Sequence, residues 1–160
     1  MAKVKVKTNA LRQLDQHKIS YEAMSYDVGD GVIDGVSVAH KINRDVSEVF
    51  KTLLVLGKSK QVYVCVIPVA CELSFKKISQ LTQEKKVEML PVGELLKTTG
   101  YVRGGCSPVG MKKLFPTFID ESAATLTEMV VSAGKVGLQL TIAPNDLARL
   151  TNATFADLTE

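Results

Sequence analysis

Residues 50–57, FKTLLVLG, and residues 61–70, QVYVCVIPVA, are the two apolar stretches that decide the fold. The polar residues Lys58, Ser59 and Lys60 separate them, and two aliphatic, β-branched runs around so short a turn are typical of a β-hairpin. Both runs are nearly continuous, whereas a strand with one wet face alternates apolar and polar residues. We therefore expect an antiparallel strand pair in the centre of a sheet.

Lys51 interrupts the first of these runs. An ammonium group in an apolar strand must either reach water along its stem or have a purpose inside a site. Two interpretations stay open from the residues alone: an edge-strand lysine that extends outward, or a lysine at the lip of a pocket that meets an anionic or carbonyl ligand. Alternation does not separate them, because Thr52, on the opposite face, is also polar.

Length and composition are those of an ordinary globular chain. The 160 residues fit one domain, residues 1–160, with 46% hydrophobic and 23% charged residues. A net charge of +3 is compatible with a polyanionic partner without requiring one. The N-terminus lacks the apolar segment of a secretory signal, and no run approaches the roughly 18 apolar residues of a membrane span. We expect no association with a membrane.

Cysteine usage indicates a reducing compartment. Cys65, Cys71 and Cys106 are odd in number and form no CxxC pair, so neither a disulfide framework nor a zinc site is expected. The expected location is the cytoplasm.

The rest of the chain alternates helices and strands without a regular βαβ rhythm. Polar caps and helical spacing predict helices, and β-branched runs predict strands. Helices are expected after Thr8 or Asn9, over residues 36–42, after Ser74, and over residues 92–100 and 144–151, with a capping box at residues 45–48. Strands are expected over residues 19–26, 86–90 and 116–121, with a second hairpin over residues 127–143. The predicted fold is one mixed α/β domain.

Two loops rich in small residues are candidate ligand walls. YVRGGCSPVG, residues 101–110, has three glycines whose backbone can approach a ligand closely, but it matches neither GxxxxGK[ST] nor GxGxxG. In VVSAGKVG, residues 130–137, Ser132, Gly134 and Lys135 interrupt an apolar hairpin. Each loop is either a simple turn or part of a site, and in the second case we expect the two to touch.

Other side chains carry weaker signals. Cys106 would need a base to form a thiolate, and neither His17 nor His40 lies in a recognisable catalytic or metal motif. A buried, inert cysteine is therefore favoured. Lys76, Lys77, Lys85 and Lys86 flank one predicted helix and are either a solvated face or phosphate contacts.

Several segments in order resemble the YbaK family of aminoacyl-tRNA deacylases. The similarity extends from about Leu11 to Leu158, and the combination of KTLLV, GGxSPxG and SxGKxG in this order is its most specific part. It runs through VFKTLLV, VIPVACELSFKKI, KVEML, TTGYVRGGCSPVGMKK, VVSAGKVGLQL and NDLARLTNATFADL. Within the family the chain is most similar to the Cys-tRNA(Pro) deacylases, which are related to the editing domain of bacterial prolyl-tRNA synthetases.

The resemblance implies a fold and an activity. The fold is one α/β domain with a mixed, partly barrel-like sheet and flanking helices. The activity is trans-editing, the hydrolytic removal of cysteine mischarged onto tRNA(Pro), because a synthetase pocket cannot strongly separate amino acids of similar size. The implied partners are Cys-tRNA(Pro) and prolyl-tRNA synthetase, with no metal and no cofactor.

The resemblance also implies site residues and a mechanism. Lys51 is the catalytic residue, and it binds the terminal adenosine or stabilises developing negative charge. The substrate's own thiol attacks the ester carbonyl, and backbone N–H groups near Gly100, Gly104 and Gly105 bind the carbonyl oxygen. The substrate-binding positions are Tyr21, Thr52, Gly100, Gly104, Gly105, Ser107, Pro108, Ser132, Gly134 and Gln139.

Two positions depart from the family pattern. Gln139 stands where members often have an acidic residue, and Asp34 lies near the position of an aromatic residue in some members. Both would shape the aminoacyl pocket. The alternatives left open are a deacylase for another small amino acid, such as alanine, and a module that binds tRNA or a synthetase without turnover.

Overall fold

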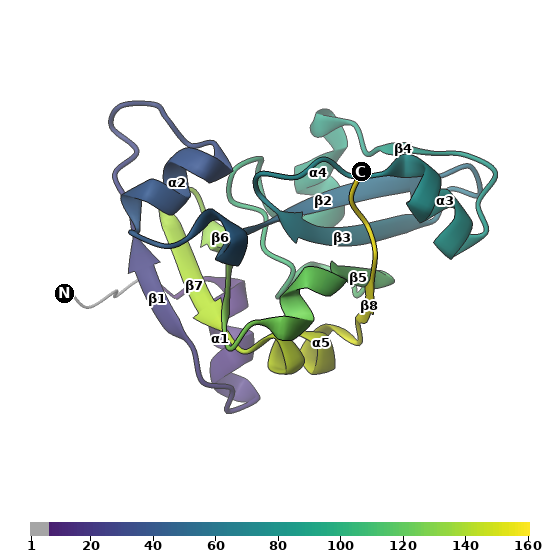
Figure 1. Ribbon diagram of the computed structural model, residues 1–160. Coiled ribbons are helices and arrows are strands. Elements are labelled where there is room, and N and C mark those ends of the chain that lie inside the picture. Colours follow the sequence, from purple (N-terminus) through teal and green to yellow (C-terminus); the bar gives the residue numbers. More distant parts are fainter. Residues whose placement is uncertain (1–6) are drawn as a thin grey trace.

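The computed structural model describes residues 7–160, which form two sheets flanked by short helices (Figure 1). The helices are α1 (Asn9–Gln16), α2 (Gly35–Lys41), α3 (Phe75–Thr82), α4 (Val92–Thr99) and α5 (Pro144–Thr151), with 3₁₀ turns η1 (Val46–Glu48) and η2 (Glu121–Thr125). The strands are β1 (Glu22–Ser25), β2 (Phe50–Gly57), β3 (Val62–Pro68), β4 (Val87–Met89), β5 (Thr117–Asp120), β6 (Met129–Lys135), β7 (Leu138–Ile142) and β8 (Thr154–Ala156).

The larger sheet is built around the predicted hairpin. Its strand order is β4-β2-β3-β5-β8, and β2 pairs antiparallel with β3 from Phe50↔Pro68 to Leu56↔Val62. Strand β4 is antiparallel to β2, whereas β5 and β8 add parallel pairs, so the sheet is mixed. The prediction of a central antiparallel pair is confirmed.

The smaller sheet has the antiparallel order β1-β7-β6 and contains the second predicted hairpin. A single parallel bridge, Val49↔Val130, links it to the larger sheet. Across residues 7–160 the two sheets do not close into a barrel, so the expectation of a partly barrel-like sheet is corrected to two sheets joined at one point.

The hairpin runs are continuous because both faces of the larger sheet are covered. One face, with Leu54, Val64 and Val66, packs in the main core against the smaller sheet and α1. The other face, with Val55 and Ile67, packs against α3 (Figure 1). Alternate residues of one strand therefore enter different cores, which removes the apolar–polar alternation.

Polar caps begin most of the helices, as the sequence predicts. Thr8 Oγ1 accepts from Leu11 N and Ser74 Oγ from Lys77 N, and Pro144 opens α5. No helix of the described part exceeds eight residues, and none could cross a membrane.

Two local expectations need correction, and two short elements were not predicted. The strand predicted over residues 19–26 spans only Glu22–Ser25. At the predicted capping box Asp45 does accept from Ser47 N, but Glu48 forms an ion pair with Arg44 at 2.8 Å, and the element is a 3₁₀ turn. The sequence analysis also missed η2 and β8, because neither has more than five residues.

Candidate active site

The bridge between the sheets aligns β2 with β6. Val49 and Val130 pair in parallel, and both belong to a buried cluster with Ala39 of α2 and Val69. Because side chains of a strand alternate between faces, the residues two positions further along, Lys51 and Ser132, continue on the same face. The topology therefore brings Lys51 beside the start of the second candidate loop.

Lys51 is half-buried and lies beyond the end of β4. Strand β4 pairs with β2 only over Val55–Gly57, with one more bond from Leu90 N to Leu54 O at 2.9 Å. Strand β2 is thus not an edge strand as a whole, but its Lys51 end has an open side. Within residues 7–160 the Lys51 ammonium forms neither a hydrogen bond nor an ion pair, which leaves its charge available to a ligand.

Thr52 faces the other way, toward the main core between the sheets, in phase with Phe50 and Leu54. Its Oγ1 is buried and has no hydrogen-bond partner among the described residues. An unpartnered buried hydroxyl costs free energy, about 1–3 kcal/mol in mutational studies. The fold therefore leaves the buried Thr52 hydroxyl without a hydrogen bond.

Ser132 and Gln139 lie opposite each other on β6 and β7, and both are buried. Ser132 Oγ accepts from Gly134 N at 3.3 Å, at the bulge where the β6–β7 turn begins. Gln139 also pairs with Met24 of β1, so it lies in the middle strand of the small sheet. Both side chains share the face that carries Val130.

The two candidate loops do touch. A Cβ added to Gly105 would lie 2.8 Å from Val136 N, and one added to Gly134 would lie 2.8 Å from Tyr101 Cε1. Such distances are shorter than any normal contact, so only glycine allows the 101–110 loop and the 132–137 turn to pack this closely. The expectation that these loops meet is confirmed.

Two of the predicted backbone donors are already in use. Gly100 ends α4 in a left-handed conformation and donates its N–H to Leu96 O at 2.8 Å, and Gly105 donates to Val102 O at 3.0 Å. Neither N–H can bind a carbonyl oxygen without losing its present bond. Gly104 N, by contrast, makes no hydrogen bond within residues 7–160, so it is the remaining candidate donor of the three.

Ser107 and Pro108 are buried and shape the same loop. Ser107 Oγ accepts from Val109 N at 3.2 Å, and Val109 O accepts from Tyr101 Oη at 2.6 Å. These bonds fix the loop from within. In the described chain, the two residues position the loop rather than expose a free polar group.

Tyr21 is held at the other end of the small sheet. Its hydroxyl donates to Asp15 Oδ1 at 2.9 Å and accepts from Lys7 Nζ at 3.0 Å, while its ring packs against the main core. Hydrogen bonds from Lys7 and Tyr21 lower the pKa of Asp15. Within the described chain no hydrogen bond joins Tyr21 to Lys51 or Ser132, so the structure does not group these three.

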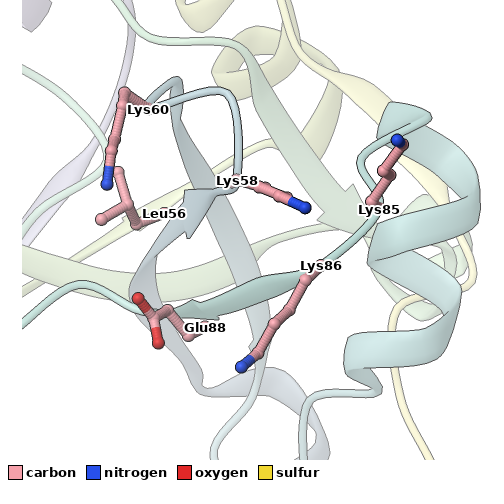
Figure 2. Close-up of a pocket in the computed structure, with 7 residues that line it drawn as sticks. Leu56, Lys58, Lys60, Lys85, Lys86 and Glu88 are labelled. Carbon is pink, nitrogen blue, oxygen red and sulfur yellow. The ribbon is translucent and has the colours of Figure 1, made fainter.

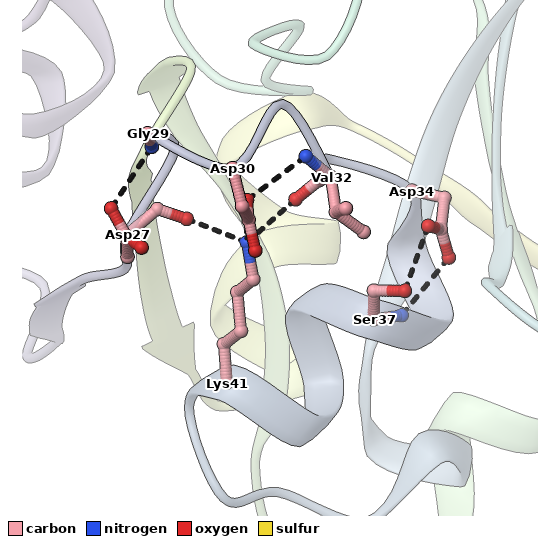
Figure 3. Close-up of polar contacts among 7 residues, drawn as sticks. All are labelled: Asp27, Gly29, Asp30, Val32, Asp34, Ser37 and Lys41. Atoms are coloured by element: carbon pink, nitrogen blue, oxygen red, sulfur yellow. Dashed lines mark hydrogen bonds and ion pairs between the residues drawn. The ribbon is translucent and has the colours of Figure 1, made fainter.

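Sequence analysis missed a clamp formed by Lys41, whose ammonium holds the loop before α2 (Figure 3). It donates to Asp27 O and Val32 O, both at 2.7 Å, and to Asp30 Oδ1 at 2.8 Å. The bond from Lys41 is the main cause of the lowered pKa of Asp30. Three aspartates in a glycine-rich segment hinted at a structured loop. The lysine that binds this loop lies outside the segment, on the helix that follows it.

The clamped loop borders the candidate site. A Cβ on Gly104 would lie 3.1 Å from Ile33 Cδ1, so this loop packs against the 101–110 loop. Asp34, which departs from the family pattern, caps α2 by accepting from Ser37 N at 3.0 Å and Ser37 Oγ at 2.8 Å (Figure 3). Its carboxylate is thus committed to the helix.

Cys106 has the properties of a packing residue. It is buried, and burial raises the pKa of its thiol to about 12, so the nucleophilic thiolate is not formed near neutral pH. His17 Nδ1 lies 2.8 Å from Gln13 O at the end of α1, and His40 is exposed on α2. In residues 7–160 no three His, Cys, Asp or Glu side chains gather as a metal site would require.

The sequence model of the aminoacyl-tRNA editing domain matches residues 33–150. The chain is 44% identical to EbsC of Enterococcus faecalis, a proposed Cys-tRNA(Pro)/Cys-tRNA(Cys) deacylase, over 99% of this chain and 98% of that protein.

Two solved structures share the fold. A proposed trans-editing enzyme for prolyl-tRNA synthetase superposes with a TM-score of 0.82 at 21% identity, covering 98% of this chain and 99% of the other. The hypothetical protein APE2540 superposes with a TM-score of 0.87 at 22% identity, covering 96% and 100%.

Replacing Lys41 by methionine tests the clamp, because methionine keeps most of the stem and removes the three bonds. We expect amide hydrogen exchange at Gly31 and Val32 to accelerate by about tenfold or more, since charged hydrogen bonds contribute about 1.5–3 kcal/mol each. Lys97→Met is the control, because the Lys97 side chain is 82% exposed and its ion pair with Glu94 is long, at 3.5 Å. Equal exchange in both variants would contradict the clamp.

Proposed function

This chain belongs to the aminoacyl-tRNA editing domain family, and from that membership we propose that it removes cysteine mischarged onto tRNA(Pro). The extensive identity to a relative named as a Cys-tRNA(Pro)/Cys-tRNA(Cys) deacylase supports both the activity and the aminoacyl group. We further propose that residues 1–160 act as one domain in the cytoplasm, beside prolyl-tRNA synthetase.

The observation that carries the proposal is the alignment of Lys51 with Ser132 through the Val49–Val130 bridge. An unpaired ammonium on a rigid central strand is suited to a fixed negative charge, because its position costs little reorganisation. The nearby loops rich in small residues supply close-packed walls. In this assignment Lys51 is the catalytic residue, and it binds the terminal adenosine and stabilises developing negative charge.

The remaining residues divide into direct and supporting roles. Gly104 N–H is the proposed donor to the carbonyl oxygen, in place of Gly100 and Gly105, whose N–H groups are bonded within the chain. Thr52 Oγ1 is buried, has no partner among the described residues and faces the main core, away from Lys51, so we propose that Thr52 supports the site from the back of β2. The other proposed substrate-binding positions, with supporting roles in shaping the site, are Tyr21, Ser107, Pro108, Ser132, Gly134 and Gln139.

The proposed chemistry uses the substrate's own thiol. The thiol loses its proton, its sulfur bonds to the ester carbonyl carbon, and the bond from that carbon to the ribose oxygen breaks. The ribose oxygen takes up a proton, so the products are free tRNA and a four-membered thiolactone, which water opens to cysteine. Holding the thiol near the carbonyl gives a high effective molarity, so no protein nucleophile is required.

Lys51→Ala tests the assignment of the catalytic residue. We expect its rate of Cys-tRNA(Pro) deacylation to fall by about 10²–10³, the usual effect of removing one electrostatic stabiliser of a transition state. Lys97→Ala, at an exposed helix position, should match wild type, and thermal unfolding should show that both variants fold. If Lys51→Ala keeps the wild-type rate, Lys51 is not catalytic; if wild type itself only matches buffer, the chain is a binding module.

Serine in place of the substrate cysteine tests the thiol. A hydroxyl is a far weaker nucleophile near neutral pH, so we expect Ser-tRNA(Pro) to be cleaved at least about 10²-fold more slowly than Cys-tRNA(Pro). Single-turnover rates with saturating protein separate this effect from binding. Equal rates for the two esters would argue for direct attack by water and a pocket that does not require cysteine.

A further inference from the structure

Four lysines surround a depression at the other end of β2. It has a volume of about 310 Å³, and Lys58 and Lys60 reach it from the β2–β3 turn, while Lys85 and Lys86 reach it from the segment before β4 (Figure 2). Glu88 is the one acidic residue among its described lining residues. From the sequence alone, Lys85 and Lys86 are expected to share one helix face with Lys76 and Lys77.

The structure separates those two pairs. Lys77 Nζ bonds to Asp157 Oδ2 at 2.8 Å and also to Thr159 O, so its charge is engaged at the C-terminus. The ammonium groups of the four lysines at the depression form no ion pair within residues 7–160. Four unpaired positive charges around one depression give it a positive potential, which favours a negatively charged ligand.

The turn that presents two of these lysines is fixed by Glu84. Its carboxylate accepts from Ser59 N at 3.1 Å, from Ser59 Oγ and from Tyr63 Oη at 2.6 Å, and the Ser59 bond is the main cause of its lowered pKa. This carboxylate is thus used for the turn and is not shared with the lysines. Lys58 N also donates to Lys86 O at 2.9 Å, which ties the two lysine-bearing segments together.

The spacing from Lys51 suits a nucleotide chain. Six residue steps along β2 lead from Lys51 to Gly57 at the depression, which is about 20 Å at about 3.3 Å per residue. Stacked nucleotides advance about 3.4 Å each along a strand, so about six nucleotides cover this length. Leu56 and Glu88 of the lining lie on the face of Leu54, opposite to Lys51, so a tRNA whose 3′ adenosine lies at Lys51 would bring its acceptor-end phosphates to the depression past the open side of β2.

We propose that Lys58, Lys60, Lys85 and Lys86 bind phosphates of the tRNA acceptor end, several nucleotides from the aminoacylated adenosine. This inference rests on the proposed function for the position of the 3′ end. The contacts are electrostatic and independent of base sequence, as phosphate contacts are. They supply affinity for tRNA, whereas the Lys51 site supplies the chemistry.

The test compares Lys60→Gln/Lys86→Gln with a charge-matched control, Lys76→Gln/Lys97→Gln, which changes two helix lysines outside the depression. The dissociation constant of uncharged tRNA(Pro) is measured by fluorescence anisotropy between 50 and 200 mM KCl. Each lost phosphate contact lowers the slope of log affinity against log salt by about 0.7–0.9. We expect a decrease of about 1.4–1.8 for the first variant and no change for the control.

A small ester separates this inference from the proposed function. Cysteinyl-adenosine carries no acceptor-stem phosphates, so Lys60→Gln/Lys86→Gln should cleave it at the wild-type rate while it cleaves Cys-tRNA(Pro) at subsaturating concentration more slowly. Equal salt slopes for both double variants would overturn the phosphate site, whatever the activity. Absence of activity in wild type would instead overturn the deacylase, and the binding slopes would still decide the lysine site.

Discussion

The parallel bridge between Val49 and Val130 is the constraint on which the candidate site depends. It is the single strand pairing between the two sheets of the described chain, and it is buried with Ala39 and Val69. Because strands have a period of two, it fixes the faces of β2 and β6 together. A shift by one residue in either strand would turn Lys51 or Ser132 to the opposite face.

Close backbone packing positions the two loops that border the candidate site. Gly105 packs against the backbone of Lys135 and Val136, and Gly134 packs against the ring of Tyr101. Tyr101 in turn bonds to Val109 O, so the two loops are rigidly joined. The walls of the site are therefore set by glycines and buried hydrogen bonds, while the charged group comes from the central sheet. This separation suits a site in which the substrate supplies the nucleophile.

Local sequence patterns were sufficient to predict the helices and strands that form within one continuous segment. The hairpin of β2 and β3 followed from two continuous apolar runs, and the helix starts at Thr8 and Ser74 followed from capping chemistry. Strand β8 could not be predicted, because three residues carry too little periodicity and its pairing with β5 is a tertiary contact.

The residues of the candidate site could be predicted from the sequence, but their arrangement in space could not. Lys51 and the two loops were identified from the sequence and the family resemblance, yet the engagement of the Gly100 and Gly105 N–H groups depends on turn geometry. Lys58 and Lys86 lie far apart in the sequence, and only the pairing of β2 with β4 joins them. A charge cluster whose residues come from different strands cannot be recognised from the order of residues alone.

The central claim is that the aminoacyl ester binds between Lys51 and the 132–137 turn. The most direct measurement is a crystal structure with 3′-cysteinylamido-adenosine, a stable amide analogue of the aminoacyl end. The account predicts the amide carbonyl and ribose within hydrogen-bonding distance of the Lys51 ammonium and the Gly104 N–H, on the face shared with Ser132. An analogue bound elsewhere, with Lys51 free of contact, would contradict it.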